Sequence, residues 1–211
     1  MNDEGQIALY HQLTEKALAK VFGRFKENPK LILTESDLKC WLFLELVKDI
    51  EGMQESTLSV HTEVTHYPRI EPNLKKFFMR DLTILDSVNV VENEEIWDNH
   101  GTGDYALSKG FNHQGCAMHF ELKLIRQGRK EASKLALDSS DIANLKNVEV
   151  GKRGYSIVWM SRNENYDLDF LIKEMNESFE MCNNDLGDKD LLRFYLCDLH
   201  NYKSYKFDVN R

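Results

Sequence analysis

Two segments with the apolar composition of β-strands carry acidic side chains that could act together. Asp81 begins the apolar run 81–85, and a second apolar run, forty residues later, contains Glu121, Leu122 and Lys123. Because alternate residues of a strand face the same side, Glu121 and Lys123 would share one sheet face, about 6.7 Å apart, with Leu122 on the other face. If the two strands are neighbours in the sheet, the carboxylates of Asp81 and Glu121 converge on one site.

Two carboxylates held close together repel each other, and a divalent cation relieves that repulsion. Mg²⁺ commonly binds one or two carboxylates and leaves its other positions to water and phosphate, and Mn²⁺ can substitute for it. The cation lowers the pKa of a bound water, and a neighbouring lysine can orient that water. We therefore predict that Asp81 and Glu121 bind Mg²⁺ and that Lys123 assists hydrolysis of a phosphodiester bond. The alternative is an ordinary pair of strands whose acids lie at the solvent edge, with a modest Glu121–Lys123 ion pair.

The elements that must position these residues follow from the periodicity of the apolar side chains. Thr34 and Asp37 form a capping box, the signature of a helix start. The predicted helices occupy 7–26, 35–50, 141–147 and 167–182, and the predicted strands occupy 58–67, 77–85, 116–126, 155–160 and 192–199. The polar, glycine-containing stretch 86–115 is expected to be an extended loop. This order predicts an α/β fold with a mixed central sheet flanked by helices.

An acid that enters one hydrophobic strand, a Glu-Leu-Lys inside another, and a helix that begins Thr34-Glu35-Ser36-Asp37 before both form a combined pattern. This pattern resembles the PD-(D/E)XK nuclease superfamily, whose restriction-endonuclease-like core has the order αβββαβ. The resemblance covers about 34–160 of a single domain spanning 1–211, which adds an N-terminal helix and a C-terminal helix–strand extension. It implies that Asp81 and Glu121 are metal ligands and that Lys123 is the catalytic lysine. The chain departs from the family in having Arg80, not proline, before Asp81, and a long connection to Glu121.

Three further residues are candidates for accessory roles. Members of the superfamily often add an acid from the helix before the sheet, and Glu45, the one acid in the middle of a largely apolar helix, is our choice. It shares a helical face with Lys48, so a solvated Glu45–Lys48 pair is the alternative. His61 and Glu63 alternate onto one face of the first strand and could point at the metal or the substrate. A half-exposed edge strand would explain them equally well.

Basic residues flank the predicted site in the sequence and are candidates for contacts with the DNA backbone. They are Lys75, Lys76, Arg80, Arg126, Arg129 and Lys130. Solvated surface charge is the alternative. The chain has 27 basic and 35 acidic residues, a net charge of −8, which disfavours binding to nucleic acid by bulk charge alone. The acids are concentrated over 86–108 and 161–190. We expect the acidic part of the loop predicted over 86–115 to lie outside the surface that would bind DNA, because its charge would repel phosphate.

Three functions are compatible with these patterns. The first is a Mg²⁺-dependent nuclease acting on DNA, with a homodimer as its expected form if it cuts both strands, because two cuts need two sites. The second is a catalytically inactive subunit that keeps the nuclease fold for binding or assembly. The third is hydrolysis of RNA or another phosphodiester. No apolar run approaches the ~18 residues that span a membrane, and the first residues are too polar for a signal peptide, so we expect a cytoplasmic protein.

Overall fold

Two helices open the chain, α1 (Asp3–Glu27) and α2 (Glu35–Glu51), as the apolar spacing predicts. The structure, a computed structural model, describes residues 3–66, 78–91, 112–113, 115–125, 153–161, 192–200 and 202–206. Each helix buries a stripe of apolar side chains spaced by three and four residues; on α2 the stripe is Leu38, Leu42, Leu46 and Ile50. Within the described ranges, no helix is both long and apolar enough to cross a membrane.

A capping box holds the first turn of α2, as predicted. The Asp37 N–H donates to Thr34 Oγ1 (3.1 Å), and the Asp37 carboxylate accepts the N–H groups of Thr34 (2.8 Å) and Leu33 (2.9 Å). Just before it, the short 3₁₀ helix η1 (Pro29–Leu31) turns the chain from α1 towards α2. These bonds satisfy N–H groups that would otherwise lack partners at a helix start. The start of α2, with Glu35 as its first residue, is therefore fixed in position.

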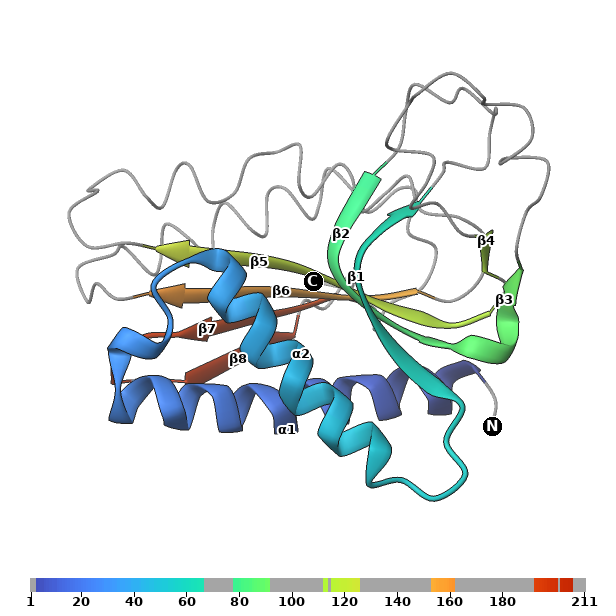
Figure 1. Cartoon of the computed structure of the whole chain (residues 1–211), viewed down its shortest axis with the longest axis horizontal. Helices are drawn as coiled ribbons and strands as arrows, with labels where there is room; N and C mark the ends of the chain where they lie inside the picture. Colours follow the sequence, from blue (N-terminus) through green and yellow to red (C-terminus); the bar gives the residue numbers. More distant parts are fainter. Residues whose placement is uncertain are drawn as a thin grey trace.

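The central sheet has six strands in the order β1-β2-β5-β6-β7-β8 (Figure 1). Their bounds are β1 Leu58–His66, β2 Phe78–Asp86, β5 Ala117–Ile125, β6 Arg153–Ser161, β7 Leu192–Cys197 and β8 Tyr202–Lys206. The pairs β1–β2, β2–β5 and β7–β8 are antiparallel, while β5–β6 and β6–β7 are parallel. The prediction of an α/β fold with a mixed sheet is therefore confirmed, and all five predicted strands are present.

Both helices pack on one face of this sheet (Figure 1). The strand residues in the same apolar core as the helices include Leu82 and Ile84 of β2 and Met118, Phe120 and Leu122 of β5. Because side chains alternate along a strand, Glu121 and Lys123 on β5 belong to the opposite face. The predicted separation of Leu122 from its two charged neighbours is therefore confirmed.

The structure adds elements that the apolar patterns did not predict. Within the stretch predicted as a loop, η2 (Ser87–Asn89) leads into β3 (Val90–Val91), which pairs with β4 (Asn112–His113) in a separate two-stranded sheet. At the far edge of the main sheet, β8 pairs with β7 after a turn in which the His200 N–H donates to the Asp198 carboxylate (2.7 Å). The predicted helices 141–147 and 167–182 lie outside the described residues.

Replacing the capping residue tests how firmly the start of α2 is held. We expect Thr34→Ala to lower the free energy of unfolding by about 1 kcal/mol, because the Asp37 N–H loses its acceptor. Urea unfolding followed by circular dichroism measures the change. The control is Ser36→Ala, an exposed serine in the same turn, which should change stability by no more than about 0.5 kcal/mol. Equal losses in the two variants would contradict the capping role.

Candidate functional site

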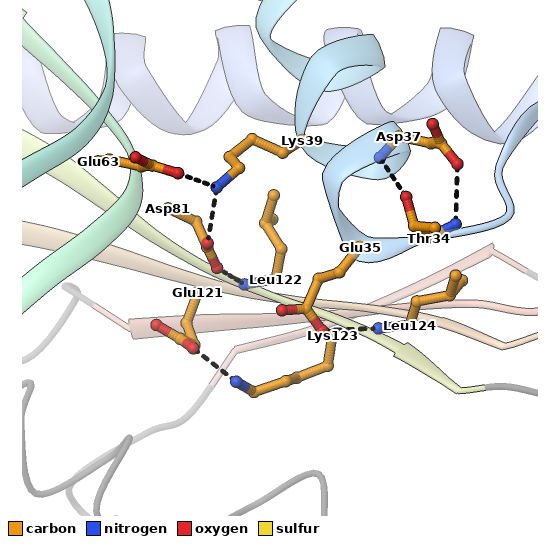
Figure 2. A network of polar contacts seen from close by, with 10 residues as sticks. All are labelled: Thr34, Glu35, Asp37, Lys39, Glu63, Asp81, Glu121, Leu122, Lys123 and Leu124. Carbon is orange, nitrogen blue, oxygen red and sulfur yellow. Dashed lines mark hydrogen bonds and ion pairs between the residues drawn. The ribbon is translucent and has the colours of Figure 1, made fainter.

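Asp81 lies where the pairing of β2 with β5 ends. The two strands pair from Leu85↔Ala117 to Leu82↔Phe120, and one position further the Asp81 carboxylate, through Oδ2, accepts the Leu122 N–H at 2.9 Å (Figure 2). A side chain thus takes the place of a backbone partner. The predicted adjacency of the two strands is confirmed. The Asp81 carboxylate reaches the β5 backbone and Lys39 of α2, whereas Glu121 lies with Lys123 on the face of β5 away from the helices (Figure 2). The convergence of the two carboxylates on one site stays a prediction.

The pairing of β2 with β1 is also irregular at Asp81. The register runs from Thr62↔Leu82 to Val64↔Arg80, and at the position between them Glu63 has a φ of +54°. A left-handed backbone is uncommon for a residue other than glycine, asparagine or aspartate and costs roughly 1–3 kcal/mol. Both neighbours of β2 therefore depart from regular strand geometry beside the same aspartate. Such local strain is typical of functional sites.

Lys39 of α2 joins the two acids on these strands. Its Nζ lies 3.2 Å from Glu63 Oε1 and 3.5 Å from Asp81 Oδ1 (Figure 2). Burial alone would lower the pKa of Lys39, but its hydrogen bonds to Glu63 and Asp81 and their charges raise the pKa above its ordinary value. Lys39 is therefore a charged ammonium group at neutral pH, held between two carboxylates.

Glu121 and Lys123 form an ion pair on the other face of β5 from Leu122. Lys123 Nζ lies 2.8 Å from Glu121 Oε1, and both side chains are largely buried, with 23% and 13% of their surface exposed, respectively. The prediction that the two share one face is confirmed. The contact is shorter than is usual for exposed pairs, and its partial burial limits screening by solvent. It orients the lysine ammonium beside the glutamate.

Glu35, the first residue of α2, reaches the same region from the helix layer. Its Oε2 accepts the Leu124 N–H at 3.4 Å, so Asp81 and Glu35 bind two alternate N–H groups of β5 (Figure 2). Burial raises the pKa of Glu35; the charge of Lys123 opposes the rise, that of Asp81 adds to it, and the Leu124 N–H and Lys39 oppose it. Glu35 therefore belongs to the same electrostatic cluster as Asp81.

Four carboxylates and two ammonium groups make up this cluster, which we call the splay site after the separation of β2 from β5. Its members are Glu35, Lys39, Glu63, Asp81, Glu121 and Lys123. With all six ionised, its formal charge is −2. Charge of that sign attracts a divalent cation and repels a free phosphate.

The carboxylate oxygens of this site are the type of ligand atom that Mg²⁺ binds. The carboxylates of Asp81 and Glu121 are oxygen donors, and one or two carboxylates are the protein ligands that Mg²⁺ commonly uses. Within the described part of the chain, no group of three or more His, Cys, Asp or Glu side chains could hold a metal ion. A cation here would therefore take its remaining ligands from water or substrate.

The structure does not bring Glu45 to this site. Its carboxylate is 4% exposed and lies between α1 and α2, where it contacts Lys20 (3.6 Å), Arg24 (3.1 Å) and Lys48 (3.2 Å). The Glu45–Lys48 pair is present, but it is not solvated as the alternative supposed, because α1 packs over that face of α2 and supplies two further cations. Glu45 is a structural residue of the helix pair, and its choice as an accessory ligand is corrected.

Of the two accessory candidates on β1, the splay site includes Glu63. His61 Nε2 is hydrogen-bonded to Ser59 Oγ at 2.8 Å, and burial lowers the pKa of His61, which favours the neutral ring. Arg80, a predicted DNA contact, is 2% exposed and so does not lie on an open phosphate track. The other predicted contacts, Lys75, Lys76, Arg126, Arg129 and Lys130, lie outside the described residues.

Sequence reasoning missed Glu35 and Lys39. The capping box places Glu35 at the first position of α2, and Lys39 follows one helical turn later, so the two share a helix face. That spacing was the available signal. It was not decisive, because only the packing of α2 on the sheet shows that this face meets β2 and β5.

Glu35→Gln tests the electrostatics of the splay site. Because the pKa of Glu35 is raised, its contribution to stability is present below the ordinary value of 4.5 and is lost as the pH rises through the folded-state value. At pH 7 we therefore expect Glu35→Gln to be more stable than the wild type, by up to about 1 kcal/mol for a half-buried charge. The difference should vanish below pH 4, as urea unfolding at both pH values would measure. A loss of stability at pH 7 would contradict the assignment.

Comparison of the chain with models of protein families, with curated proteins and with solved structures finds no match. What the site does is therefore inferred from its own chemistry. That chemistry consists of an aspartate anchored between separating strands, a glutamate–lysine pair on the adjoining strand, and a second lysine from the helix layer.

Proposed function

We propose that this protein is a Mg²⁺-dependent nuclease that hydrolyses DNA phosphodiester bonds. The observation that carries the proposal is the anchoring of Asp81 across the end of the β2–β5 pairing, beside the Glu121–Lys123 pair. An acid and a Glu-x-Lys on adjoining strands are the residues expected of the PD-(D/E)XK superfamily, and the Asp81 carboxylate binds the backbone N–H of Leu122, the residue between Glu121 and Lys123. The two acids and the lysine of that pattern are Asp81 on β2 and Glu121 and Lys123 on β5.

The order of the elements supports a restriction-endonuclease-like core. A helix, α2, precedes three consecutive antiparallel strands of the main sheet, β1, β2 and β5, and β6 then adds in parallel to β5. This is the strand arrangement expected of an αβββαβ core. On this interpretation α1 is an N-terminal addition, and β7 and β8 extend the sheet beyond the core.

The charge of the splay site explains why the reaction would need a cation. A phosphodiester carries a negative charge, and a site of formal charge −2 opposes its approach. When bound, Mg²⁺ would neutralise that charge, lower the pKa of a water ligand and stabilise charge on the phosphate. Asp81 and Glu121 are the residues that would hold it, and Mn²⁺ could take its place.

The residues of the chain have separable roles in this proposal. The Leu122 N–H fixes Asp81 Oδ2, and Oδ1, which has the longer contact at 3.5 Å to Lys39, is the oxygen that would bind the cation. Glu121 fixes the Lys123 ammonium at 2.8 Å, from where Lys123 can orient the attacking water or donate a hydrogen bond to the phosphate. Glu63 and Glu35 would supply further negative charge on either side of Asp81.

The second candidate is a catalytically inactive protein that keeps this fold for binding or assembly. One observation favours it: each carboxylate of the splay site already contacts an ammonium group or a backbone N–H. A site whose carboxylates already have partners within the protein needs no metal ion to be stable. A homodimer and a cytoplasmic location are further predictions that accompany the nuclease proposal.

Cleavage assays decide between these functions. We expect the purified protein with Mg²⁺ to cut plasmid or single-stranded DNA. Asp81→Asn and Lys123→Met should each reduce the rate by at least about 100-fold, because each removes a group acting on the reacting atoms. Glu51→Gln, an exposed acid at the end of α2, is the charge-matched control and should retain full activity.

Cleavage that persists in both variants would contradict the nuclease assignment. Absence of cleavage, combined with no Asp81-dependent binding of Mn²⁺ in calorimetry, would favour the inactive subunit. RNA substrates belong in the same assay, because hydrolysis of RNA or another phosphodiester is compatible with the same sequence patterns.

A further inference from the structure

The two oxygens of Asp81 differ in what holds them. Oδ2 accepts the Leu122 N–H at 2.9 Å, a good hydrogen bond that links β2 to β5. Oδ1 faces only Lys39 Nζ among the described contacts of this carboxylate, at 3.5 Å, the outer limit of hydrogen bonding. Oδ1 is therefore the oxygen that a cation would take, and Lys39 is the group it would meet there.

Lys39 has a second acceptor that is closer. Its Nζ lies 3.2 Å from Glu63 Oε1, against 3.5 Å from Asp81, and Glu63 adopts its left-handed φ of +54° at this point of β1. If Asp81 Oδ1 is taken, the ammonium group keeps a carboxylate partner. Its displacement therefore leaves no buried charge without a counter-ion, a situation that proteins avoid.

The lysine cannot leave the site altogether. It projects from the second turn of α2, whose first turn is fixed by the Thr34–Asp37 capping box, and its side chain is 17% exposed. A cation on Asp81 would therefore bind within a few ångströms of a positive charge that remains nearby. Like charges at that separation repel, most strongly where solvent screening is reduced.

We propose that Lys39 is the built-in counter-ion of Asp81 and exchanges with the divalent cation. Without metal, the ammonium bridges Asp81 and Glu63; with metal on Asp81 Oδ1, it contacts Glu63 alone. Lys39 thereby weakens the metal affinity of the site while keeping Asp81 charge-balanced when metal is absent. This role rests on the proposed metal site at Asp81 and goes beyond it, because it assigns to Lys39 and Glu63 the regulation of that site.

Calorimetric titration of the full chain with Mn²⁺ tests this role. Removing the competing charge in Lys39→Met should tighten Mn²⁺ binding about tenfold, and Lys39→Gln should act in the same direction. Lys39→Arg, which keeps the charge, should bind within about threefold of the wild type. Lys48→Met removes a lysine from the same helix outside the splay site and should leave Mn²⁺ affinity unchanged.

A double-mutant cycle tests the part played by Glu63. Glu63→Gln should weaken Mn²⁺ binding several-fold, because Lys39 loses its alternative acceptor and stays on Asp81. In the Lys39→Met background the same change should have at most about half that effect on the logarithm of the affinity, since the residues act through one contact. Equal effects of Glu63→Gln in both backgrounds would overturn the exchange.

The outcomes separate this proposal from the function on which it rests. If wild-type Mn²⁺ binding is abolished by Asp81→Asn but is unchanged or weakened in both Lys39→Met and Lys39→Gln, the metal site stands and the counter-ion role is wrong. If no variant shows Mn²⁺ binding that depends on Asp81, the metal site and the exchange both fall. Circular dichroism confirms that each variant is folded before it is titrated.

Discussion

The hydrogen bond from the Leu122 N–H to the Asp81 carboxylate is the contact on which the rest of the site depends. Where β2 separates from β5, the N–H groups of β5 lose strand partners, and buried N–H groups need acceptors. Asp81 and Glu35 provide them. The same separation that creates the need for acceptors therefore draws two acids into one place, and a third, Glu121, lies next to Leu122 on the strand.

Stability and reactivity place opposite demands on these acids. A cluster of carboxylates at the end of a sheet pairing is destabilising by itself, and the two lysines reduce that repulsion. Each lysine comes from a different layer: Lys123 from the sheet and Lys39 from the helix above it (Figure 2). Lys123 Nζ lies 2.8 Å from Glu121, whereas Lys39 Nζ lies 3.2 Å and 3.5 Å from its two acids. The longer contacts make the helix lysine the more easily displaced of the pair.

Local patterns predicted the elements, and packing decided the site. Thr34 with Asp37 marked the start of α2, and the alternation around Leu122 placed Glu121 with Lys123 correctly, since both are properties of neighbouring residues. Glu45 was misplaced because the pattern within one helix does not show which second helix covers it. The left-handed backbone of Glu63 has no signature in residue type. β8 lacks an apolar alternation, although Asp198, which forms the turn before it, was a readable signal.

The buried charges between the two helices have a consequence at the opposite end of α2. Glu45 contacts Lys20 and Arg24 of α1, and Asp49, one turn further, contacts Lys16 and Lys20. Turning α2 about its own axis would carry both carboxylates away from these cations while they remain covered. These ion pairs near the C-terminal end of α2 therefore fix the rotation of the helix about its own axis. Because α2 is one continuous helix, this fixed rotation also orients Glu35, about 15 Å away along the axis, towards the strand beneath it.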